Sequence, residues 1–523
     1  MSAPAEREIE LDIGAVLVPE VRVAGTIASP TEILPDPEYL LRFPPAGVVA
    51  FGRTPAGAVS PVKLLRTLRA AMRAKGESEP FACCDLEQGA GLHFTEGTRL
   101  PPALALAAAA TGARTPAQGI ALLRAAGELT AREARACGIE LVLAPVADVN
   151  TARDNPIIAV RSFGDDPKRA GRLARAWLEG LRAGGAAGCA KHFPGHGDTS
   201  QDSHIELARV SRDEQGLREI ELVPFRELLH AGVETVMVGH LDVPAMTGER
   251  GLPATLSERA ITGVLRGELG FTGAVLSDAM NMGALAQEPR RYARALTAGC
   301  DGLLCPHDPH AAAAELLAAV ASGELSRERL AQAASTMRAL RDELRSRSIA
   351  PRPLHSQVGE NSPLEARATF AADLGAAALV ASPASWPWRR GKSCEVGMSE
   401  PELPTPEARR QIALLREALA QDSSPAGVVL PVVCEVRAFH GGYGLTETEI
   451  TSLLERVADL RRLKWPVGLI WFGSPQTLPR NLWEDPNLPI VLAHAPTPPM
   501  FAAVRAWLQG KIEAGGSLPA SLG

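Results

Sequence analysis

The chain has 523 residues, of which 46% are hydrophobic and 22% are charged, and its formal net charge is −6 at pH 7. This length suffices for about three average domains, although one barrel domain routinely uses about 250 residues. The acidic balance argues against an electrostatic partnership with nucleic acid, so no nucleic-acid partner is expected.

The N-terminus and the cysteines argue against export. Residues 1–10 are polar and acidic, without the basic and apolar regions of a secretory signal. The sequence has no run of about twenty apolar residues, the length that spans a membrane. The Ala-rich run 103–110 is too short for that and indicates a helix. The eight cysteines show no CxxC spacing, which argues against a zinc site and a disulfide framework. We expect a cytoplasmic protein with no membrane contact and no metal.

Short apolar runs alternate with longer stretches rich in Ala, Leu and Arg along the first two thirds of the chain. The candidate strands are 10–17, 47–51, 81–84, 140–144, 188–190, 235–238, 274–276 and 302–304. The candidate helices include 61–74, 115–137, 167–183, 212–231 and 289–298. This alternation, repeated about eight times, favours a (β/α)8 TIM-type barrel over a doubly wound sheet.

The pattern stops after about Leu344 and then restarts. A stretch rich in Pro, Ser and charged residues follows, which is typical of a linker. Beyond it, strands are expected at 428–436, 467–472 and 489–493, and helices at 446–463 and 498–509. We therefore predict a catalytic barrel domain over residues 1–345, a linker over 346–366, and a shortened three-layer α/β sandwich over 367–523.

Polar residues repeatedly follow the predicted strands of the barrel. They are Asp85, Asp148, Lys191 with His192, His240 and Asp278. The carboxyl ends of barrel strands meet at one face, where barrels carry their chemistry. We therefore expect these side chains to converge.

The segment Lys191-His192-Phe193-Pro194-Gly195-His196-Gly197-Asp198, followed by Asp202-Ser203-His204, is the most informative feature of the sequence. A solvated Gly-rich loop needs neither the Lys-His pair nor the Asp-Ser-His run. A second segment, Gly270 to Gly283, is an apolar strand that ends in Ser277-Asp278. Together the two segments resemble the signature of glycoside hydrolase family 3, in its β-N-acetylglucosaminidase branch. The resemblance covers roughly residues 10–340, with a weaker match beyond.

The resemblance implies two catalytic roles. It makes Asp278 the nucleophile and His204 the acid/base residue, paired with Asp202. The chemistry is consistent, because retention of configuration needs an attacking carboxylate and a proton donor that later acts as base. An unperturbed His titrates near pH 6.5, and a neighbouring carboxylate orients its ring. The position of Asp278 alone leaves a second interpretation open, in which Ser277 or Asp278 caps a helix over 279–285.

The resemblance also implies a set of sugar ligands. Asp85, Arg161, Lys191 and His192 match residues that bind substrate in the family, and His240 is a further candidate. The family usually shows Asp-Gln-Glu-Gly-Gly-Arg with another Arg shortly after, whereas this chain has Asp85-Leu86-Glu87-Gln88-Gly89 and then His93. His93 stands where the second Arg is expected, so we expect altered contacts either to the N-acetylglucosamine ring or to the group beyond it.

The expected function is that of a retaining β-N-acetylhexosaminidase. Its partner would be a small carbohydrate with a terminal β-linked N-acetylglucosamine, in cell-wall recycling or chitooligosaccharide processing, without a cofactor. The sequence carries no signal for an oligomeric state. Three alternatives stay open: phosphorolysis by the same residues, β-glucosidase activity with Glu447 or Glu449 as the acid, and a sugar-binding protein without turnover.

Overall fold

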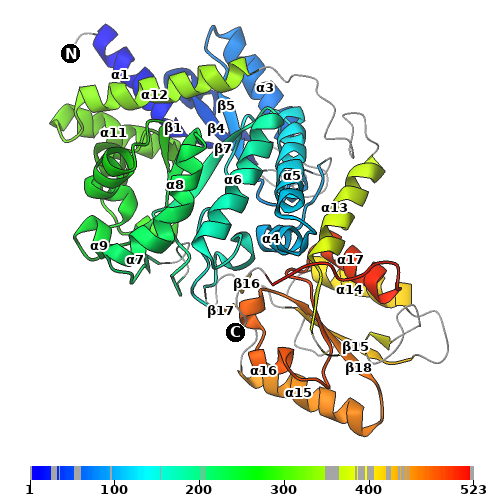
Figure 1. Ribbon diagram of the computed structural model, residues 1–523. Coiled ribbons are helices and arrows are strands. Elements are labelled where there is room, and N and C mark those ends of the chain that lie inside the picture. Colours follow the sequence, from blue (N-terminus) through cyan, green and yellow to red (C-terminus); the bar gives the residue numbers. More distant parts are fainter. Residues whose placement is uncertain are drawn as a thin grey trace. The chain divides into compact units, whose positions relative to one another are not determined.

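The computed structural model (Figure 1) divides into two compact units. The first unit comprises Met1–Gly97, Ala126–Asp148 and Ala174–Arg352, and the second comprises Thr98–Ala125, Val149–Leu173 and Pro353–Gly523. The structure describes residues 3–24, 32–34, 36–51, 61–94, 97–153, 155–201, 203, 206–347, 364–382, 384, 386, 395–396, 406–419, 426–433, 436–437, 442–443 and 447–518.

A parallel sheet lies at the centre of the first unit. Its strand order is β11-β9-β7-β6-β5-β4-β2-β3, and only β3 runs antiparallel to its neighbour. The bounds are β2 (Glu20–Ala24), β3 (Glu32–Leu34), β4 (Gly47–Ala50), β5 (Phe81–Cys84), β6 (Leu141–Val142), β7 (Ala187–Phe193), β9 (Thr235–Val238) and β11 (Ala274–Ser277). Pairing continues beyond β11, because Leu276 bridges Gly302 and β12 (Leu303–Leu304) pairs in parallel with β1 (Leu17–Val18).

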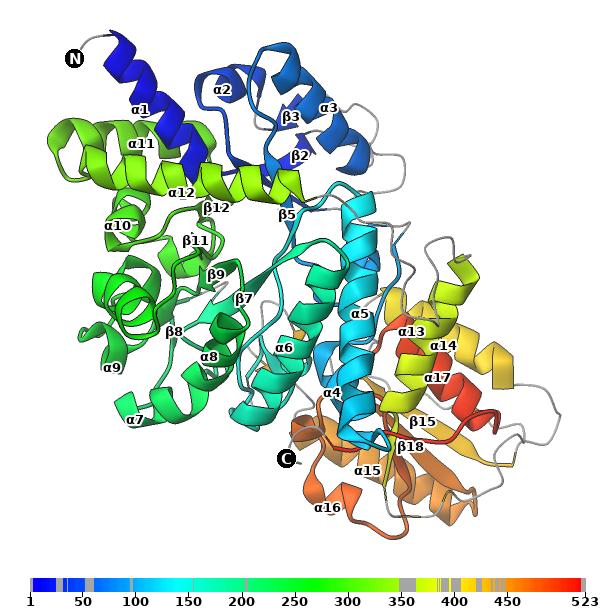
Figure 2. The same ribbon diagram turned by 45° about the horizontal axis from the view of Figure 1, so that its top comes forward.

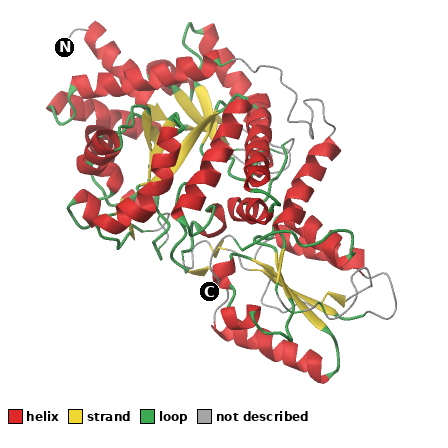
Figure 3. Cartoon of the chain, viewed as in Figure 1, coloured by secondary structure: helices red, strands yellow, loops and turns green. Residues whose placement is uncertain are grey.

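Helices surround these strands (Figure 3). The longer ones are α1 (Ala3–Val16), α2 (Pro37–Arg42), α3 (Pro61–Ala74), α5 (Pro116–Ala136), α6 (Pro167–Ala183), α8 (Leu222–His230), α10 (Arg291–Ala298), α11 (Pro309–Ser322) and α12 (Arg327–Ser346). Helix α12 shows why such segments are helical. Its buried residues recur every three or four positions, and the hydroxyl of Ser326 caps its start by accepting from the amide of Arg329.

Most side chains of these strands are apolar, and they are buried on both faces. Every residue of β4, β5, β7, β9 and β11 is buried, which is typical of parallel sheets. Strand β7 contains one extra residue relative to β9. Between Ala190 and Phe193 it advances three residues while β9 advances from Val236 to Val238. Such a bulge re-aims side chains next to it, and here those side chains are Lys191 and His192.

Most predicted elements of the first unit are confirmed, and the strand at 10–17 is wrong. Residues up to Val16 form helix α1, and the strand β1 is only Leu17–Val18. Ile9, Ile13 and Val16 are all buried on one side of α1, which is a helical spacing. A short apolar run fits the spacing of a helix and that of a strand, so tertiary packing decides which of the two residues 10–17 form. The strand β2 and the long helices α11 and α12 were not predicted.

The second unit contains a five-stranded sheet in the order β13-β19-β18-β15-β14, in which only β13 is antiparallel. Its strands are β13 (Val380–Ala381), β14 (Glu395–Val396), β15 (Val428–Val433), β18 (Val467–Phe472) and β19 (Ile490–Leu492). Helices α13 (Leu364–Ala378), α14 (Pro406–Leu419) and α17 (Pro498–Leu508) lie on one face, and α15 (Glu447–Arg462) and α16 (Arg480–Trp483) on the other (Figure 2).

The Ala-rich run is helix α4 (Ala103–Gly112), as predicted, and it packs against α13. Most of the predicted linker, residues 348–363, lies outside the described residues. Within the part of the chain that the structure describes, no helix is long and apolar enough to cross a membrane.

Candidate active site

Polar side chains from neighbouring strands of the first unit lie together at the carboxyl end of the sheet. They are Asp85 after β5, Asp148 beyond β6, Lys191 and His192 in β7, His240 after β9, and Asp278 after β11. Direct contacts link strand to strand: Lys191 binds Asp85, His192 binds Asp148, and the amide of Asp278 donates to the carbonyl of Val238 at 2.9 Å. The set is therefore one continuous cluster.

Lys191 is a buried cation held by two carboxylates. Its Nζ lies 2.5 Å from Oδ1 of Asp85 and 2.6 Å from Oε1 of Glu87, while its side chain is only 2% exposed. A buried ammonium needs such partners, because an unpaired buried charge is very costly. The side chain of Asp85 remains 30% exposed, so its carboxylate can still meet a ligand from solvent.

Asp148 orients His192 and the loop that follows it. Its carboxylate accepts from the backbone amide of His192 at 3.1 Å, from Nδ1 of His192 at 2.7 Å and from the backbone amide of His196 at 2.7 Å. Burial acts to raise the pKa of Asp148, but the two histidines and these hydrogen bonds outweigh it and hold the pKa below its usual value. An ionised carboxylate only accepts, so Nδ1 of His192 carries a proton.

Asp278 is an ionised carboxylate at the end of β11. Burial acts to raise its pKa, but His192, His240, the amide of Ala279 and Lys191 together lower the pKa to about 2. The amide of Ala279 donates to Oδ1 of Asp278 at 2.8 Å and fixes the side chain. Asp278 is only partly buried, so this anion is accessible as well as rigidly held.

The helix-cap interpretation of Ser277 and Asp278 is wrong. The first helical turn after β11 is the 3-10 segment Gly283–Leu285, and its cap position is Met282. The hydroxyl of Ser277 instead accepts from the amide of Leu304 at 3.1 Å and links β11 to β12.

His240 is completely buried beside Asp278, with both ring nitrogens engaged by protein groups. Nε2 lies 3.1 Å from the carbonyl oxygen of Ala279, and Nδ1 lies 2.8 Å from Oγ1 of Thr255. A carbonyl only accepts, so Nε2 donates. Burial lowers the pKa of His240 despite the nearby charge of Asp278, which favours the neutral ring. His240 is thus placed to hold the backbone that follows Asp278.

The loop after β7 is folded around a second buried histidine. Nδ1 of His196 lies 2.8 Å from Oγ1 of Thr199, and Nε2 lies 2.8 Å from Oγ of Ser203. All three residues are buried. Asp202 and His204, the predicted acid/base pair, lie outside the described residues, and Ser203 is the residue between them.

A buried ion network supports the same loop from behind. Arg212 binds Oε1 of Glu221 at 2.7 Å and Oδ1 of Asp198 at 3.1 Å. Glu221 ends a π-helical turn (Leu217–Glu221) that precedes α8, a feature often found near functional sites. A Cβ atom at Gly195 would meet Oε2 of Glu221 at 2.5 Å, so only glycine fits there. Burial raises the pKa of Glu221 to about 7, although Arg212 lowers it.

The remaining predicted ligands lie on separate segments. His93 ends the 3-10 turn Ala90–Leu92 in the first unit, with its ring 5.6 Å from that of Phe51. Arg161 ends the turn Ala159–Arg161 in the second unit and donates to the carbonyl of Ile157 at 3.3 Å. Of the two glutamates of the alternative mechanism, Glu449 lies within α15, and the side chain of Glu447 is outside the described residues.

Sequence reasoning missed several residues of this cluster. Glu87 carried a usable signal, because it stands two positions after Asp85. His196 belongs to the recognised motif but had no assigned role. Arg212 precedes the short helix α7 (Glu214–Gly216), and Glu221 ends the π-helical turn. Neither gave a local signal, since only the folded chain brings them to the loop.

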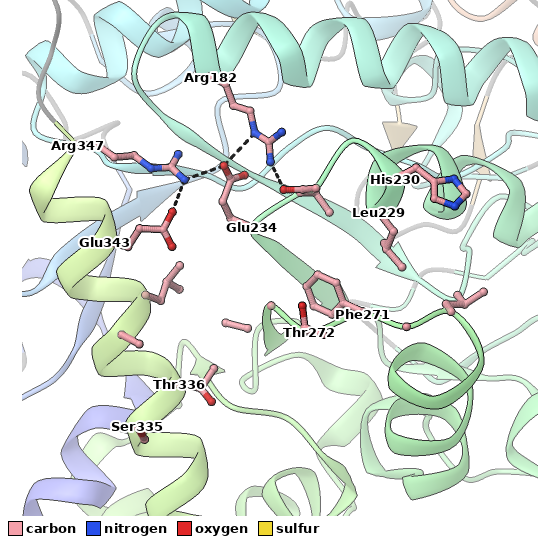
Figure 4. Close-up of a pocket in the computed structure, with 18 of the residues that line it drawn as sticks. Arg182, Leu229, His230, Glu234, Phe271, Thr272, Ser335, Thr336, Glu343 and Arg347 are labelled. Atoms are coloured by element: carbon pink, nitrogen blue, oxygen red, sulfur yellow. Dashed lines mark hydrogen bonds and ion pairs between the residues drawn. The ribbon is translucent and has the colours of Figure 1, made fainter.

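A cavity of about 1080 Å³ lies away from this cluster. Its walls include Glu234 before β9 and Gly273 before β11, so it faces the amino ends of the strands. Figure 4 shows Glu234 between Arg182 and Arg347. Oε1 of Glu234 lies 3.0 Å from Nε of Arg182 and 2.9 Å from a terminal guanidinium nitrogen of Arg347. This end of the strands lies opposite the end that carries the polar cluster. We therefore assign these ion pairs a structural role.

The described residues contain no group of three or more His, Cys, Asp or Glu side chains arranged to hold a metal ion. What the cluster offers is an ionised, accessible carboxylate beside protonatable and cationic groups. Such an arrangement suits attack on an electrophilic carbon and binding of vicinal hydroxyl groups.

Comparison with known proteins points in one direction. Residues 36–340, more than half of the chain, match the family model described as the glycosyl hydrolase family 3 N terminal domain. A protein from Alkalilimnicola ehrlichii named Beta-hexosaminidase is 40% identical over 274 residues, which are 52% of this chain and 76% of that protein. A Beta-hexosaminidase from Stenotrophomonas maltophilia is 37% identical over 291 residues, which are 55% of this chain and 82% of that protein.

Solved structures extend the similarity over the whole chain. A family 3 β-N-acetylglucosaminidase from a Paenibacillus species superposes with a TM-score of 0.76 and 25% identity, covering 98% of both chains. A β-glucoside phosphorylase superposes with a TM-score of 0.77 and 20% identity, covering 100% of this chain and 97% of its own, which shows a shared fold.

Proposed function

The chain belongs to glycosyl hydrolase family 3 and is a glycoside hydrolase, and from this premise we propose that it is a retaining β-N-acetylhexosaminidase. The proposal is supported by the names of its relatives, since proteins 36–40% identical to it are named Beta-hexosaminidase. The observation that carries it is the ionised Asp278, held at the end of β11 among Lys191, His192 and His240.

We further propose that the strands of the first unit close into a (β/α)8 barrel and that the second sheet with its helices is an α/β sandwich. The parallel pairings from β2 to β11, the bridge from Leu276 to Gly302 and the β12–β1 pair support closure. The proposed domain bounds remain 1–345 and 367–523, joined by 346–366.

In the proposed first step, a carboxylate oxygen of Asp278 bonds to the anomeric carbon while the bond from that carbon to the aglycone oxygen breaks. His204 gives its proton to the departing oxygen, and a covalent glycosyl-Asp intermediate results. A pKa of about 2 supports this role, because Asp278 is then an anion near neutral pH.

In the second step, His204 takes a proton from water as the water oxygen bonds to the anomeric carbon and Asp278 leaves. We propose that Asp202 orients the His204 ring and stabilises its protonated form. The proposed sugar ligands are Asp85, Lys191, His192, His93 and Arg161. His240 was a further candidate ligand in the sequence, but its ring is completely buried with both nitrogens engaged by protein groups, so we propose instead that it positions the Asp278 backbone.

The proposed substrates are fragments of cell wall or chitin with a terminal β-linked N-acetylglucosamine, met in the cytoplasm. The test compares release of 4-nitrophenol from the β-N-acetylglucosaminide and the β-glucoside, with and without phosphate. Preference for the acetamido sugar, unaffected by phosphate, supports the proposal. Phosphate acceleration would reassign the chain as a phosphorylase, and glucoside preference would point to the β-glucosidase alternative.

A further inference from the structure

Ser203 is held in place by a buried histidine. Oγ of Ser203 lies 2.8 Å from Nε2 of His196, and the two residues are 2% and 1% exposed. The hydroxyl of Thr199 donates to the carbonyl of His196 at 3.1 Å, so Nδ1 of the ring can donate to the oxygen of Thr199. In this arrangement the neutral ring accepts at Nε2, and the hydroxyl of Ser203 donates to it.

His196 is itself fixed to the rigid part of the site. Its backbone amide donates to Asp148 at 2.7 Å, and the same carboxylate holds the ring of His192. The neighbouring Asp198 is tied through Arg212 to the fully buried Glu221. The side chain of His196 therefore joins Ser203 to a framework that is anchored on β7 and on the π-helical turn before α8.

We propose that His196 is a positioning residue for proton transfer, which acts by fixing Ser203, the residue that stands between Asp202 and His204 in the sequence. This inference rests on the proposed function, in which His204 is the acid/base residue. His196 need not touch substrate, and its effect passes through one hydrogen bond to Ser203.

Matched substitutions separate the two hydrogen bonds of the ring. In His196→Asn the amide nitrogen takes the place of Nδ1 but cannot reach Ser203, whereas in His196→Gln the longer side chain reaches toward Ser203 but loses Thr199. Ser203→Ala removes the partner hydroxyl and Ser203→Thr keeps it. His230→Gln, at the exposed end of α8, is the control for replacing a histidine.

The readout is the dependence of kcat/KM on the leaving group. Protonation matters for poor leaving groups and little for 2,4-dinitrophenol, which departs without it. General acid catalysis contributes about 100- to 10,000-fold, so imperfect positioning should cost about 10- to 100-fold with a methyl or 4-methoxyphenyl aglycone. With a 2,4-dinitrophenyl aglycone, kcat/KM should stay within about threefold of the wild-type value, since this leaving group needs no proton.

The expected pattern is that His196→Asn and Ser203→Ala share this selective loss, while His196→Gln and Ser203→Thr retain most activity. Equal losses for all leaving groups, or no loss in His196→Asn, would overturn the inference. His204→Ala is measured alongside. If that variant shows no leaving-group dependence, the acid/base role of His204 fails and the positioning role falls with it. If His204→Ala does show leaving-group dependence but the His196 variants do not, only the positioning role of His196 is overturned.

Discussion

The carboxylate of Asp148 accepts a hydrogen bond from Nδ1 of His192 at 2.7 Å. It also accepts from the backbone amides of His192 and His196, and so holds the start of the loop after β7. One buried anion thus fixes both a proposed sugar ligand and the segment that leads to the proposed acid/base residue.

Asp148→Asn is expected to lower kcat/KM about tenfold to 100-fold without unfolding the protein. The Asn oxygen can still accept from the two backbone amides that Oδ1 of Asp148 now binds. The NH₂ group then takes the place of Oδ2, and it cannot accept the hydrogen bond from Nδ1 of His192. The measurement is a double-mutant cycle with His192→Ala. Because both residues act as one unit, the double variant should be no worse than His192→Ala alone, and full additivity would contradict the account.

Glu221 makes stability depend on pH near neutrality. Burial raises its pKa from 4.5 to about 7, with Arg212 opposing and Asp148 and Asp198 adding to the rise. The folded protein therefore binds a proton more tightly than the unfolded chain between these values, so stability falls as pH rises through this window.

Glu221→Gln removes this titration. As the pH rises from 4.5 to 8, wild type should lose about 2–4 kcal/mol of its free energy of unfolding relative to the Glu221→Gln variant. Denaturant unfolding of both proteins across that range gives the comparison. Parallel pH profiles for the two proteins would show that Glu221 titrates normally in the folded state.

Glu234→Gln is expected to reduce stability and leave catalysis intact. Glu234 is 7% exposed, accepts from Arg182 and Arg347, and also binds the amide of Gly188 at 3.1 Å. Loss of the charge leaves two cations underpaired, at a cost of about 1–3 kcal/mol. Thermal unfolding should report a lower Tm, while kcat/KM stays within about twofold because this network faces the amino ends of the strands. A large loss of activity would mean that this end of the sheet serves catalysis.

Gln476 and Asn150 form a buried amide pair within the second unit. Nε2 of Gln476 donates to the carbonyl of Asn150 at 2.7 Å, and the side chain of Asn150 donates to Oε1 of Gln476. Arg161 follows on the same segment, Val149–Leu173. Gln476→Ala should raise KM about threefold to tenfold with little change in kcat, since it loosens the segment that presents a proposed sugar ligand. Unchanged KM would show that the Gln476–Asn150 pair does not support substrate binding.

Much of the fold was readable from the sequence because buried parallel strands are short apolar runs between amphipathic helices. The strands at 81–84 and 235–238 and the helix at 61–74 were predicted at the same residues. Residues 10–17 were misread, since whether Ile9 and Ile13 lie on a helix or a strand depends on what packs against them. Residues 279–282 form a hydrogen-bonded turn but no helix, so Asp278 caps no helix there. The sequence alone left that interpretation open.

The site was predictable where it depends on strand ends and hidden where it depends on long-range packing. Asp85, Lys191 and Asp278 each follow or end an apolar run and could be found one at a time. Arg212 and Glu221 meet the loop after β7 only because the helical segment folds back beneath Gly195. No local pattern records such a contact.

The most direct test of the central claim is to trap the intermediate on Asp278. The enzyme is incubated with 5-fluoro-N-acetyl-β-glucosaminyl fluoride, which forms the glycosyl-enzyme readily and releases it slowly, and is then digested for peptide mass spectrometry. The account predicts one fluorinated N-acetylglucosaminyl group on the peptide that contains Asp278, and none in Asp278→Asn. A label on another carboxylate, such as Glu449, or rapid turnover without any labelled peptide, would contradict the claim that Asp278 is the nucleophile.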